Sequence, residues 1–284
     1  MQANTDQNVD ANVARGFGKE WASFRQGEES LSREQREAIF ADYFRIFPWR
    51  LLPPGGGVGI DVGCGSGRWS MLVAPRVAHL HLLDVSAEAL TIARENLKGN
   101  NNISFHLSSV AEIPLPAQSL DFAFSLGVLH HVPDTQAAIR AIADKLKNGA
   151  PLLIYLYYAF DNRAPWYRAL WAMSNTVRII VSRLPHPLRK AISEMIAAFV
   201  YWPLARLSLL AARLGLPLQS MPLAWYSDKS FYVMRTDSYD RFCTQLEKRF
   251  SKTQIERMLT DAGFASISFS ESPPYWCAVG IKSA

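Results

Sequence analysis

The stretch Gly59-Ile60-Asp61-Val62-Gly63-Cys64-Gly65-Ser66-Gly67 decides the fold. It begins inside a short apolar run, residues 58–62, whose β-branched side chains are typical of a strand. Glycine then occupies every other position, which lets the backbone pass close to a ligand where any Cβ would clash. The helix that we expect next has free N–H groups at its start. The stretch therefore predicts a strand, a ligand-contacting turn and a helix.

The spacing of these glycines indicates which ligand the turn contacts. It is GxGxG, whereas a dinucleotide-binding turn has GxGxxG, and Asp61 stands two places before the first glycine. We therefore expect no pyrophosphate in the turn. The ligand instead carries an amino-acid end, whose positive amine lies near the negative charge of Asp61.

A second acidic residue, Asp84, ends the next predicted strand, 17 residues after Gly67. A carboxylate at this position can accept hydrogen bonds from both hydroxyls of a ribose. The alternative is a helix-capping or turn aspartate, which the sequence Asp-Val-Ser also suits. The glycine turn that precedes it favours the ribose role.

Strand and helix patterns alternate outward from the glycine turn. Such alternation over about 110 residues predicts a parallel sheet with helices on both faces. A further helix precedes the turn at 32–47. We expect strands at 58–62, 79–83, 103–107, 120–124 and 151–158, helices at 66–74, 86–97 and 135–146, and, near the end of the chain, a helix at 251–259 followed by closing strands at 265–269 and 276–281.

The alternation stops after the fifth strand. No strand pattern occurs between 162 and 221, and this segment is typical of two or three helices. We expect these helices to be broken at Pro185, Pro187, Pro203 and Pro217.

Composition limits the class of protein. The chain has 284 residues, of which 49% are apolar, enough for a sizeable core. Its cysteines, Cys64, Cys243 and Cys277, are far apart and in no CxxC pattern, which argues against a disulfide framework and a zinc site. The polar N-terminus lacks an apolar signal core, so we expect a cytoplasmic protein.

The net charge of +5 belongs to one region. Residues 163–223 carry eight basic side chains and a single acidic one, Glu194, so this segment is +7 and the rest of the chain is −2. The basic excess therefore describes the surface or the partner of that region rather than of the whole protein.

Three motifs in order resemble those of class I S-adenosylmethionine-dependent methyltransferases. They are residues 61–67, residues 83–86 and the run Leu-Gly-Val-Leu-His-His-Val-Pro-Asp at 126–134. The similarity is greatest to the type 11 group, which includes the ubiquinone and menaquinone methyltransferases. The resemblance covers roughly residues 16–158 and the closing strands. It implies a Rossmann-like α/β fold with seven strands in the order 3-2-1-4-5-7-6, the last one antiparallel.

The pattern of strands and helices predicts an organisation in four parts, and the resemblance implies a set of cofactor contacts. The parts are an N-terminal tail with leading or lid helices (1–50), the cofactor-binding core (51–160), a helical insertion (161–224) that forms a lid or substrate subdomain, and the C-terminal part of the core (225–284). In the N-terminal part, Phe17 and Trp21 either cover the cofactor or staple the first helix to the domain. The implied cofactor-binding residues are Asp61, Gly63, Cys64, Gly65, Gly67, Asp84, Val85, Ser109, Val110, Leu126 and Trp21.

Methyl transfer from a sulfonium is an in-line displacement in which positioning does much of the work. A general base is needed only if the acceptor must lose a proton. His130 and His131 are the candidate bases, and Tyr157 follows the fifth strand close to them. The alternative is a structural or cofactor-side role for the two histidines, because in the resembling family this pair accompanies many different substrates.

Polar and aromatic side chains after the fifth strand and after the insertion are candidate substrate contacts. The same residues could instead lie in solvated loops with ion pairs of their own. The candidates are Tyr155, Tyr158, Arg163, Tyr226, Arg235 and Arg241.

The helical insertion mixes basic residues with many large apolar ones. Glu194, Pro203 and Arg206 interrupt its longest apolar stretch, which argues against a membrane-spanning helix. The insertion could form a lid over an apolar substrate, which we favour, or lie on a membrane through residues 163–223, or form a dimer interface. The remaining alternative is an ordinary helical subdomain with a basic surface.

Together these features predict an enzyme that transfers a methyl group from S-adenosylmethionine to O, N or C of a small, mostly apolar or aromatic metabolite. The product would be S-adenosylhomocysteine, and we expect no metal. We expect a monomer or homodimer and no nucleic-acid partner, because the arginines are interleaved with apolar residues. The alternatives are an RNA (tRNA) methyltransferase and a non-catalytic cofactor-binding scaffold.

Overall fold

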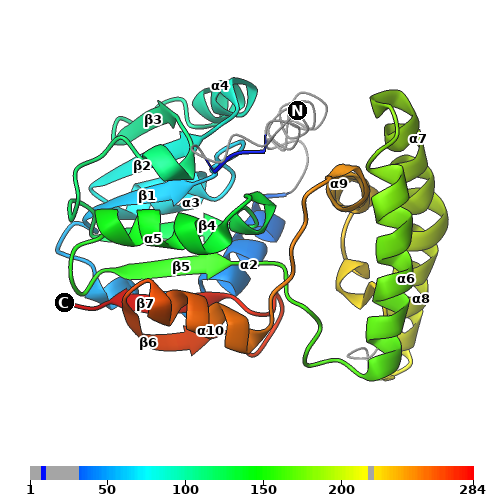
Figure 1. The fold of residues 1–284 in the computed structure, drawn as a ribbon. Coiled ribbons are helices and arrows are strands. Elements are labelled where there is room, and N and C mark those ends of the chain that lie inside the picture. Colours follow the sequence, from blue (N-terminus) through cyan, green and yellow to red (C-terminus); the bar gives the residue numbers. More distant parts are fainter. Residues whose placement is uncertain (1–7, 11–31, 217–220) are drawn as a thin grey trace. The chain divides into compact units, whose positions relative to one another are not determined.

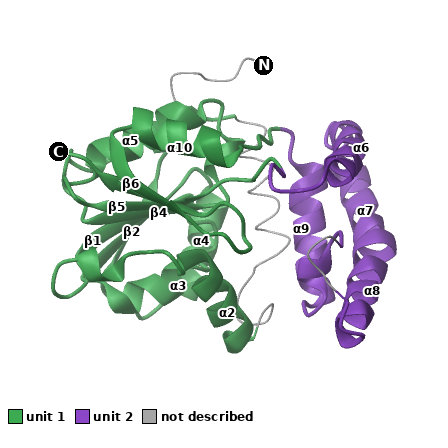
Figure 2. Cartoon of the chain, turned by 90° about the horizontal axis from the view of Figure 1, so that it is seen from below, with its two compact units in different colours: residues 1–159, 246–284 green, residues 160–245 purple. Residues whose placement is uncertain are grey.

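The computed structural model describes residues 8–10, 32–216 and 221–284. The chain divides into two compact units, which are coloured separately in Figure 2. Unit 1 comprises residues 1–159 and 246–284, and unit 2 comprises residues 160–245. Each unit is described by itself below.

Unit 1 contains a seven-stranded sheet in the order β3-β2-β1-β4-β5-β7-β6 (Figure 1). The first five strands pair in parallel, and β7 is antiparallel to both of its neighbours. This confirms the predicted fold class and strand order. The strands are β1 (Val58–Val62), β2 (His79–Asp84), β3 (Ile103–Leu107), β4 (Phe122–Leu126), β5 (Pro151–Tyr155), β6 (Phe264–Phe269) and β7 (Ala278–Lys282).

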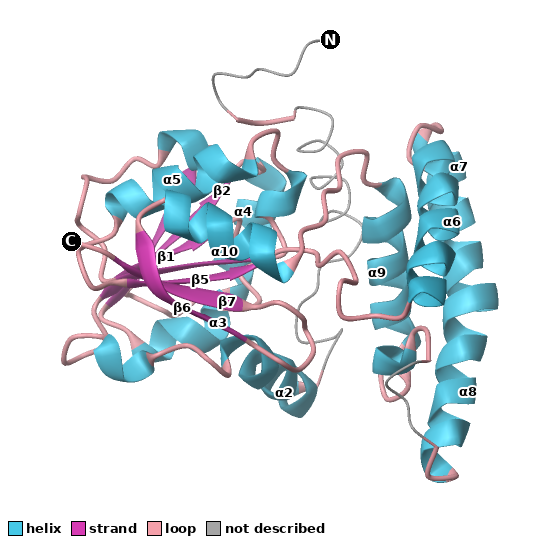
Figure 3. Cartoon of the chain, turned by 60° about the horizontal axis from the view of Figure 1, so that its bottom comes forward, coloured by secondary structure: helices cyan, strands magenta, loops and turns pink. Residues whose placement is uncertain are grey.

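Helices cover both faces of this sheet, with α5 and α10 on one face and α2 and α3 on the other (Figure 3). Three of them begin where the sequence predicts, because the side chains of Ser86, Asp134 and Ser251 cap their first N–H groups. The helices are α2 (Arg33–Phe44), α3 (Ser70–Val73), α4 (Ala87–Asn96), α5 (Thr135–Lys145) and α10 (Lys252–Asp261), with short 3₁₀ turns at Trp49–Leu51, Ala74–Arg76, Val110–Glu112 and Leu129–His131.

The two faces of the sheet bury different kinds of side chain. On one face, aliphatic residues of the central strands pack against α5 and α10, with Ile60, Ile139 and Ile255 all fully buried. On the other face the ring of Phe122 lies over Gly59, where a Cβ would come within 2.1 Å of it. Both faces of the central strands β1, β4 and β5 are therefore covered, as their largely apolar sequence requires.

Unit 2 is entirely helical among its described residues. It consists of α6 (Pro165–Val181), α7 (His186–Ile196), a π-helical turn (Ala197–Tyr201), α8 (Trp202–Arg213), a 3₁₀ turn (Ala224–Tyr226) and α9 (Phe231–Cys243). Its core lies between α6, α8 and α9 and contains Val181, Tyr201, Ala205, Met234 and Phe242.

Two predictions about the insertion were wrong. Pro203 does not break a helix, because the π-helical turn before it accommodates a residue without an N–H, and α7 runs through that turn into α8. The insertion also ends at Gln245 rather than at residue 224, because α9 packs against α6 and α7. Of the described residues, only the continuous helix His186–Arg213 has the length and apolar composition needed to cross a membrane.

Histidines cluster where β2 meets β3 on the half-buried side of the sheet. His79 Nε2 lies 2.9 Å from Ser104 Oγ, and His81 Nδ1 lies 2.9 Å from His106 Nε2. Burial, followed by the neighbouring His79 and His106, lowers the pKa of His81 to about 4. Burial lowers the pKa of His106 as well. His81 therefore stays neutral over a pH range in which free histidine would be charged.

This difference predicts acid sensitivity of the fold. Because the pKa of His81 is lower in the folded chain than the 6.5 of the unfolded one, the unfolded chain binds more protons between pH 6.5 and 4. Stability should therefore fall as the pH falls through this window. We expect His81→Gln, which keeps a hydrogen-bonding partner for His106, to flatten the decline of the melting temperature in a calorimetric pH series. An unchanged slope of melting temperature against pH would contradict the role of His81 in this acid sensitivity.

Candidate functional site

The glycine turn between β1 and α3 has the backbone that its sequence requires. Gly63, Gly65 and Gly67 have φ angles of +79°, +54° and +72°, a region that side chains with a Cβ rarely adopt. The N–H groups of Gly63 and Cys64 donate to Leu83 O at 2.7 and 3.1 Å. These bonds tie the turn to the end of β2, at the carboxyl edge of the sheet where ligands bind in this class of fold.

Asp84 links the end of β2 to the same turn. Its Oδ2 accepts the Gly65 N–H at 2.9 Å, and its Oδ1 accepts the Ser86 N–H at 2.9 Å. Both roles considered for this residue are therefore compatible, since it caps its own turn while each oxygen keeps a lone pair for a ribose hydroxyl. Burial raises the pKa of Asp84, and the two backbone hydrogen bonds oppose that rise.

Asp61 is almost completely buried, with 3% of its surface exposed. Its carboxylate accepts a hydrogen bond of 2.6 Å from the hydroxyl of Ser70, the first residue of α3. Burial raises the pKa of Asp61 to about 7, and the nearby charge of Asp84 adds to this effect. A cationic amine at this position would offset the cost of burying the charged carboxylate.

Two buried hydroxyls close to the turn lack a hydrogen-bond partner among the described residues, those of Ser66 and Ser109. Gly127, which follows β4, has a φ angle of +78°, and a Cβ there would meet nothing within 4 Å. Orphaned polar groups and an open backbone at the carboxyl edge fit a polar ligand such as S-adenosylmethionine. The residues present therefore fit the expected cofactor.

The other predicted cofactor contacts have different environments. Val110 is buried beside Ser109, Leu126 ends β4, and Val85 is exposed directly after Asp84. Cys64 is buried, and burial raises the pKa of its thiol, which is therefore inert. Trp21 and Phe17 lie outside the described residues.

His130 and His131 differ in the hydrogen bonds that set their protonation. His130 is fully buried, and its Nδ1 accepts the Tyr157 N–H at 3.4 Å, which places the proton on Nε2. Burial, followed by His131 and Arg249, lowers the pKa of His130 well below its ordinary value. His131 Nδ1 lies 2.6 Å from Leu246 O and must donate to it, so its lone pair is on Nε2.

An aromatic cluster surrounds these histidines. The ring of His130 stacks on Tyr157 with centroids 3.8 Å apart, and Tyr155 lies 6.0 Å from Tyr157. Tyr43 of α2 contacts Tyr155 at a centroid distance of 5.2 Å. Burial raises the pKa of Tyr155 well above its ordinary value, so this phenol stays neutral.

The segment 246–250 holds this cluster in place, a role for which no sequence motif provides a signal. Lys248 N–H donates to His130 O at 3.1 Å, and Phe250 N–H donates to Tyr157 O at 2.9 Å. The guanidinium of Arg249 lies 5.0 Å from the centroid of the Tyr157 ring. These contacts, like the bond between His131 and Leu246, join residues that are roughly 90 to 120 positions apart in the chain.

The predicted substrate residues are divided between the two units. In unit 1, Tyr155 belongs to the aromatic cluster, and Tyr158 contacts Tyr275 at a centroid distance of 5.4 Å. The four in unit 2 have partners within that unit, as the alternative of separate polar contacts expects, and their role toward a substrate stays a prediction. Arg163 faces the Tyr167 ring, Tyr226 donates to Asp237, Arg235 pairs with Glu194, and Arg241 donates to Ser174.

No group of three or more His, Cys, Asp or Glu side chains within residues 8–10, 32–216 and 221–284 is arranged to hold a metal ion. Cys64, Cys243 and Cys277 are buried thiols.

Comparison with known proteins identifies the core. Residues 60–154 match the family model of a methyltransferase domain. A ubiquinone biosynthesis O-methyltransferase of Xanthomonas axonopodis pv. citri is 34% identical over 105 residues, which cover 36% of this chain and 44% of the relative. One from Hahella chejuensis is 33% identical over 138 residues, covering 45% and 56%. The chain thus spans about half the length of the curated relatives that it matches.

Solved structures share the fold at low sequence identity. A chain in the Haloferax volcanii complex between the Trm112 methyltransferase activator and a methyltransferase has a TM-score of 0.55 and 15% identity, covering 96% of this chain and 98% of that one. A SAM-dependent methyltransferase of Thermotoga maritima has a TM-score of 0.51 and 13% identity, covering 95% and 100%. These likenesses bear on the fold alone and agree with the strand order.

Asp84 should dominate cofactor affinity. We expect Asp84→Asn to weaken binding of S-adenosylhomocysteine by about 10- to 100-fold, because hydrogen bonds to a charged group contribute about 1.5–3 kcal/mol each. Asp84→Ala should lose more, since it also releases the Gly65 N–H. Calorimetric titration measures both, with the exposed Asp144→Asn as the matched control. Unchanged affinity in Asp84→Ala, in a folded protein, would contradict the ribose role.

Asp61 should couple binding to pH. With the pKa near 7 in the free protein, the carboxyl is partly protonated at neutral pH and must lose its proton to hold a cationic amine. Affinity should therefore rise as the pH increases through about 7, with a proton released on binding. Calorimetry in two buffers of different ionisation enthalpy detects this proton. Asp61→Asn should abolish the release, and an Asn variant with the same pH profile would refute the coupling.

Proposed function

We propose that this chain, whose core belongs to the type 11 group of class I S-adenosylmethionine-dependent methyltransferases, transfers a methyl group from S-adenosylmethionine to a small, mostly apolar or aromatic metabolite. The observation that carries the proposal is the left-handed glycine turn bonded to Asp84 at the carboxyl edge of β1 and β2. The product is S-adenosylhomocysteine, and no step requires a metal.

The chain's own residues supply positioning. Asp84 would hold the sugar, Asp61 and the glycine turn would hold the amino-acid end, and Ser109 would contact the base. When bound, S-adenosylmethionine supplies an activated methyl group. Bringing the acceptor atom into line with that methyl can contribute about 7–11 kcal/mol to lowering the barrier, because it replaces a bimolecular encounter.

Proton removal is assigned to His131 when the acceptor is a hydroxyl. Its Nε2 carries the lone pair, because Nδ1 donates to Leu246 O. His130 is the weaker base, since its Nδ1 already accepts the Tyr157 N–H and its pKa is lowered. We assign His130 and Tyr157 to shaping the site, with Nε2–H of His130 as a buried donor.

The substrate class rests on the aromatic cluster and on the relatives. Rings of Tyr43, Tyr155 and Tyr157 lie near the end of β5, which favours a flat or apolar substrate. The similarity in sequence to ubiquinone biosynthesis O-methyltransferases supports an oxygen acceptor. Buried free cysteines support a cytoplasmic location, where thiols stay reduced.

The direct test is transfer of labelled methyl from S-adenosylmethionine into a host extract, followed by separation of small molecules, lipids, RNA and protein. We expect label in the small-molecule or lipid fraction, and none with Asp84→Ala, which removes a cofactor contact. Label in RNA would instead support a tRNA methyltransferase. Binding of the cofactor without label in any fraction of several extracts would support the non-catalytic scaffold and contradict our proposal.

A further inference from the structure

Large apolar side chains lie exposed along α6 of unit 2. They recur at intervals of three and four residues, so they form one stripe along the helix. Met173 is 70% exposed and Ile180 is 61% exposed. The stripe consists of Trp166, Leu170, Met173, Val177 and Ile180.

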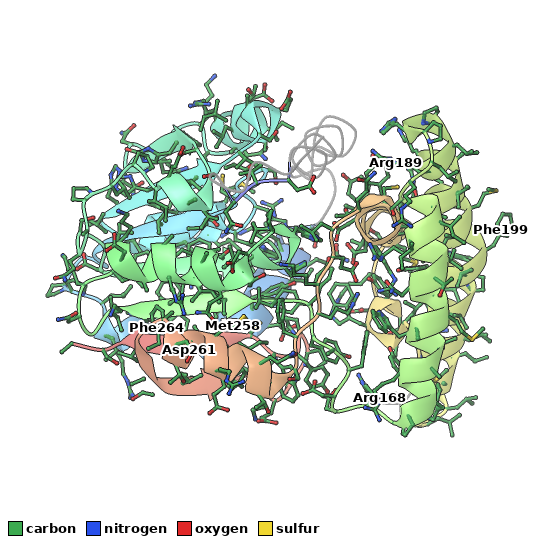
Figure 4. The ribbon with its side chains drawn as sticks, in the orientation of Figure 1. Arg168, Arg189, Phe199, Met258, Asp261 and Phe264 are labelled. Carbon is green, nitrogen blue, oxygen red and sulfur yellow. The ribbon has the colours of Figure 1, made fainter. Side chains whose placement is uncertain are left out.

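The helix α7–α8 shows the same feature more strongly, because several of its small residues face inward beside Tyr201, while many of its large apolar residues are exposed. Phe199 is 77% exposed and projects away from α9 (Figure 4). A helix that served only the core of its own unit would show the reverse pattern. The buried residues include Ser193, Ala197, Ala205 and Ser208, and the exposed ones include Leu188, Met195, Phe199, Leu207, Leu210 and Leu214.

Basic residues accompany these stripes. Arg168 is exposed near the start of α6, Arg183 lies exposed just after its end, and Arg213 ends α8. Residues 163–223 carry a charge of +7 in total. Exposed apolar side chains among arginines complement an anionic bilayer surface, where rings and aliphatic groups enter the interface and guanidinium groups meet phosphates.

We propose that α6 and α7–α8 bind unit 2 to the surface of an anionic lipid bilayer. The helices lie in the plane of the interface. Although α7–α8 is long enough to span, its other side carries Glu194 paired with Arg235 and the buried Ser193, which would be costly in hydrocarbon. A second copy of the chain is less suited to cover this apolar surface, because it would bring one +7 segment against another.

This proposal is independent of the methyl-transfer proposal and is tested without turnover. The full chain is mixed with vesicles of phosphatidylcholine, with or without phosphatidylglycerol, and floated on a density gradient. We expect it to float with the anionic vesicles and to be released as the salt concentration rises.

Paired variants separate the two contributions. Phe199→Glu combined with Leu210→Glu should weaken vesicle binding at least about tenfold, since each side chain leaves the interface. Arg183→Gln combined with Arg213→Gln should weaken it by about fivefold per arginine, and only for anionic vesicles. Leu51→Glu changes an equally exposed leucine of unit 1 and is the matched control.

Three results would overturn the proposal. The first is a chain that stays unbound with both kinds of vesicle at low salt. The second is a dimer, detected by light scattering, that Phe199→Glu with Leu210→Glu converts to a monomer, because a second copy would then cover this face. The third is equal loss of binding in Leu51→Glu. Thermal unfolding of each variant confirms that it is folded.

Discussion

The hydrogen bond from Gly65 N–H to the Asp84 carboxylate is the contact on which the site depends. It requires β1 and β2 to be parallel neighbours in register, with Val62 opposite Leu83, so that both strands end at the same edge. It also requires a left-handed backbone at Gly65, which a residue with a Cβ would strain. Fold and ligand site are therefore specified together, by the same short stretch.

Much of unit 1 could be predicted from sequence for a physical reason. Its central strands β1, β4 and β5 are covered on both faces, so they appear as short apolar runs. Helices of the unit begin at capping residues such as Ser86 and Ser251. Unit 2 lacks such signals. The buried residues of α9 lie on several sides, since α6 and α7 both pack against it, and no single apolar stripe marks the helix. Pro203 was misleading because a π-helical turn accommodates it.

The candidate site likewise has one part that the sequence predicts and one part that it does not. Cofactor contacts follow from local motifs, and the sequence places them near the ends of β1, β2 and β4. The aromatic cluster does not follow from a local motif, because it combines α2, the residues after β5 and the segment 246–250, which are far apart in the chain. The same holds for the two histidines, which are simple neighbours in the sequence. Hydrogen bonds with backbone groups elsewhere in the chain place the proton of each ring on a different nitrogen. Only the folded chain distinguishes a base from a donor.

The two units place their large apolar residues differently, and this difference connects the two proposals. Unit 1 buries large aliphatic and aromatic side chains in its core. Unit 2 buries Tyr201, Met234 and Phe242, but it leaves other large apolar side chains, such as Met173, Phe199 and Leu210, exposed along α6 and α7–α8. An apolar metabolite is concentrated in bilayers by the same hydrophobic effect that would bind those side chains. A chain held at that surface would meet such a substrate at high local concentration, so interfacial binding and an apolar acceptor support each other although each is tested alone.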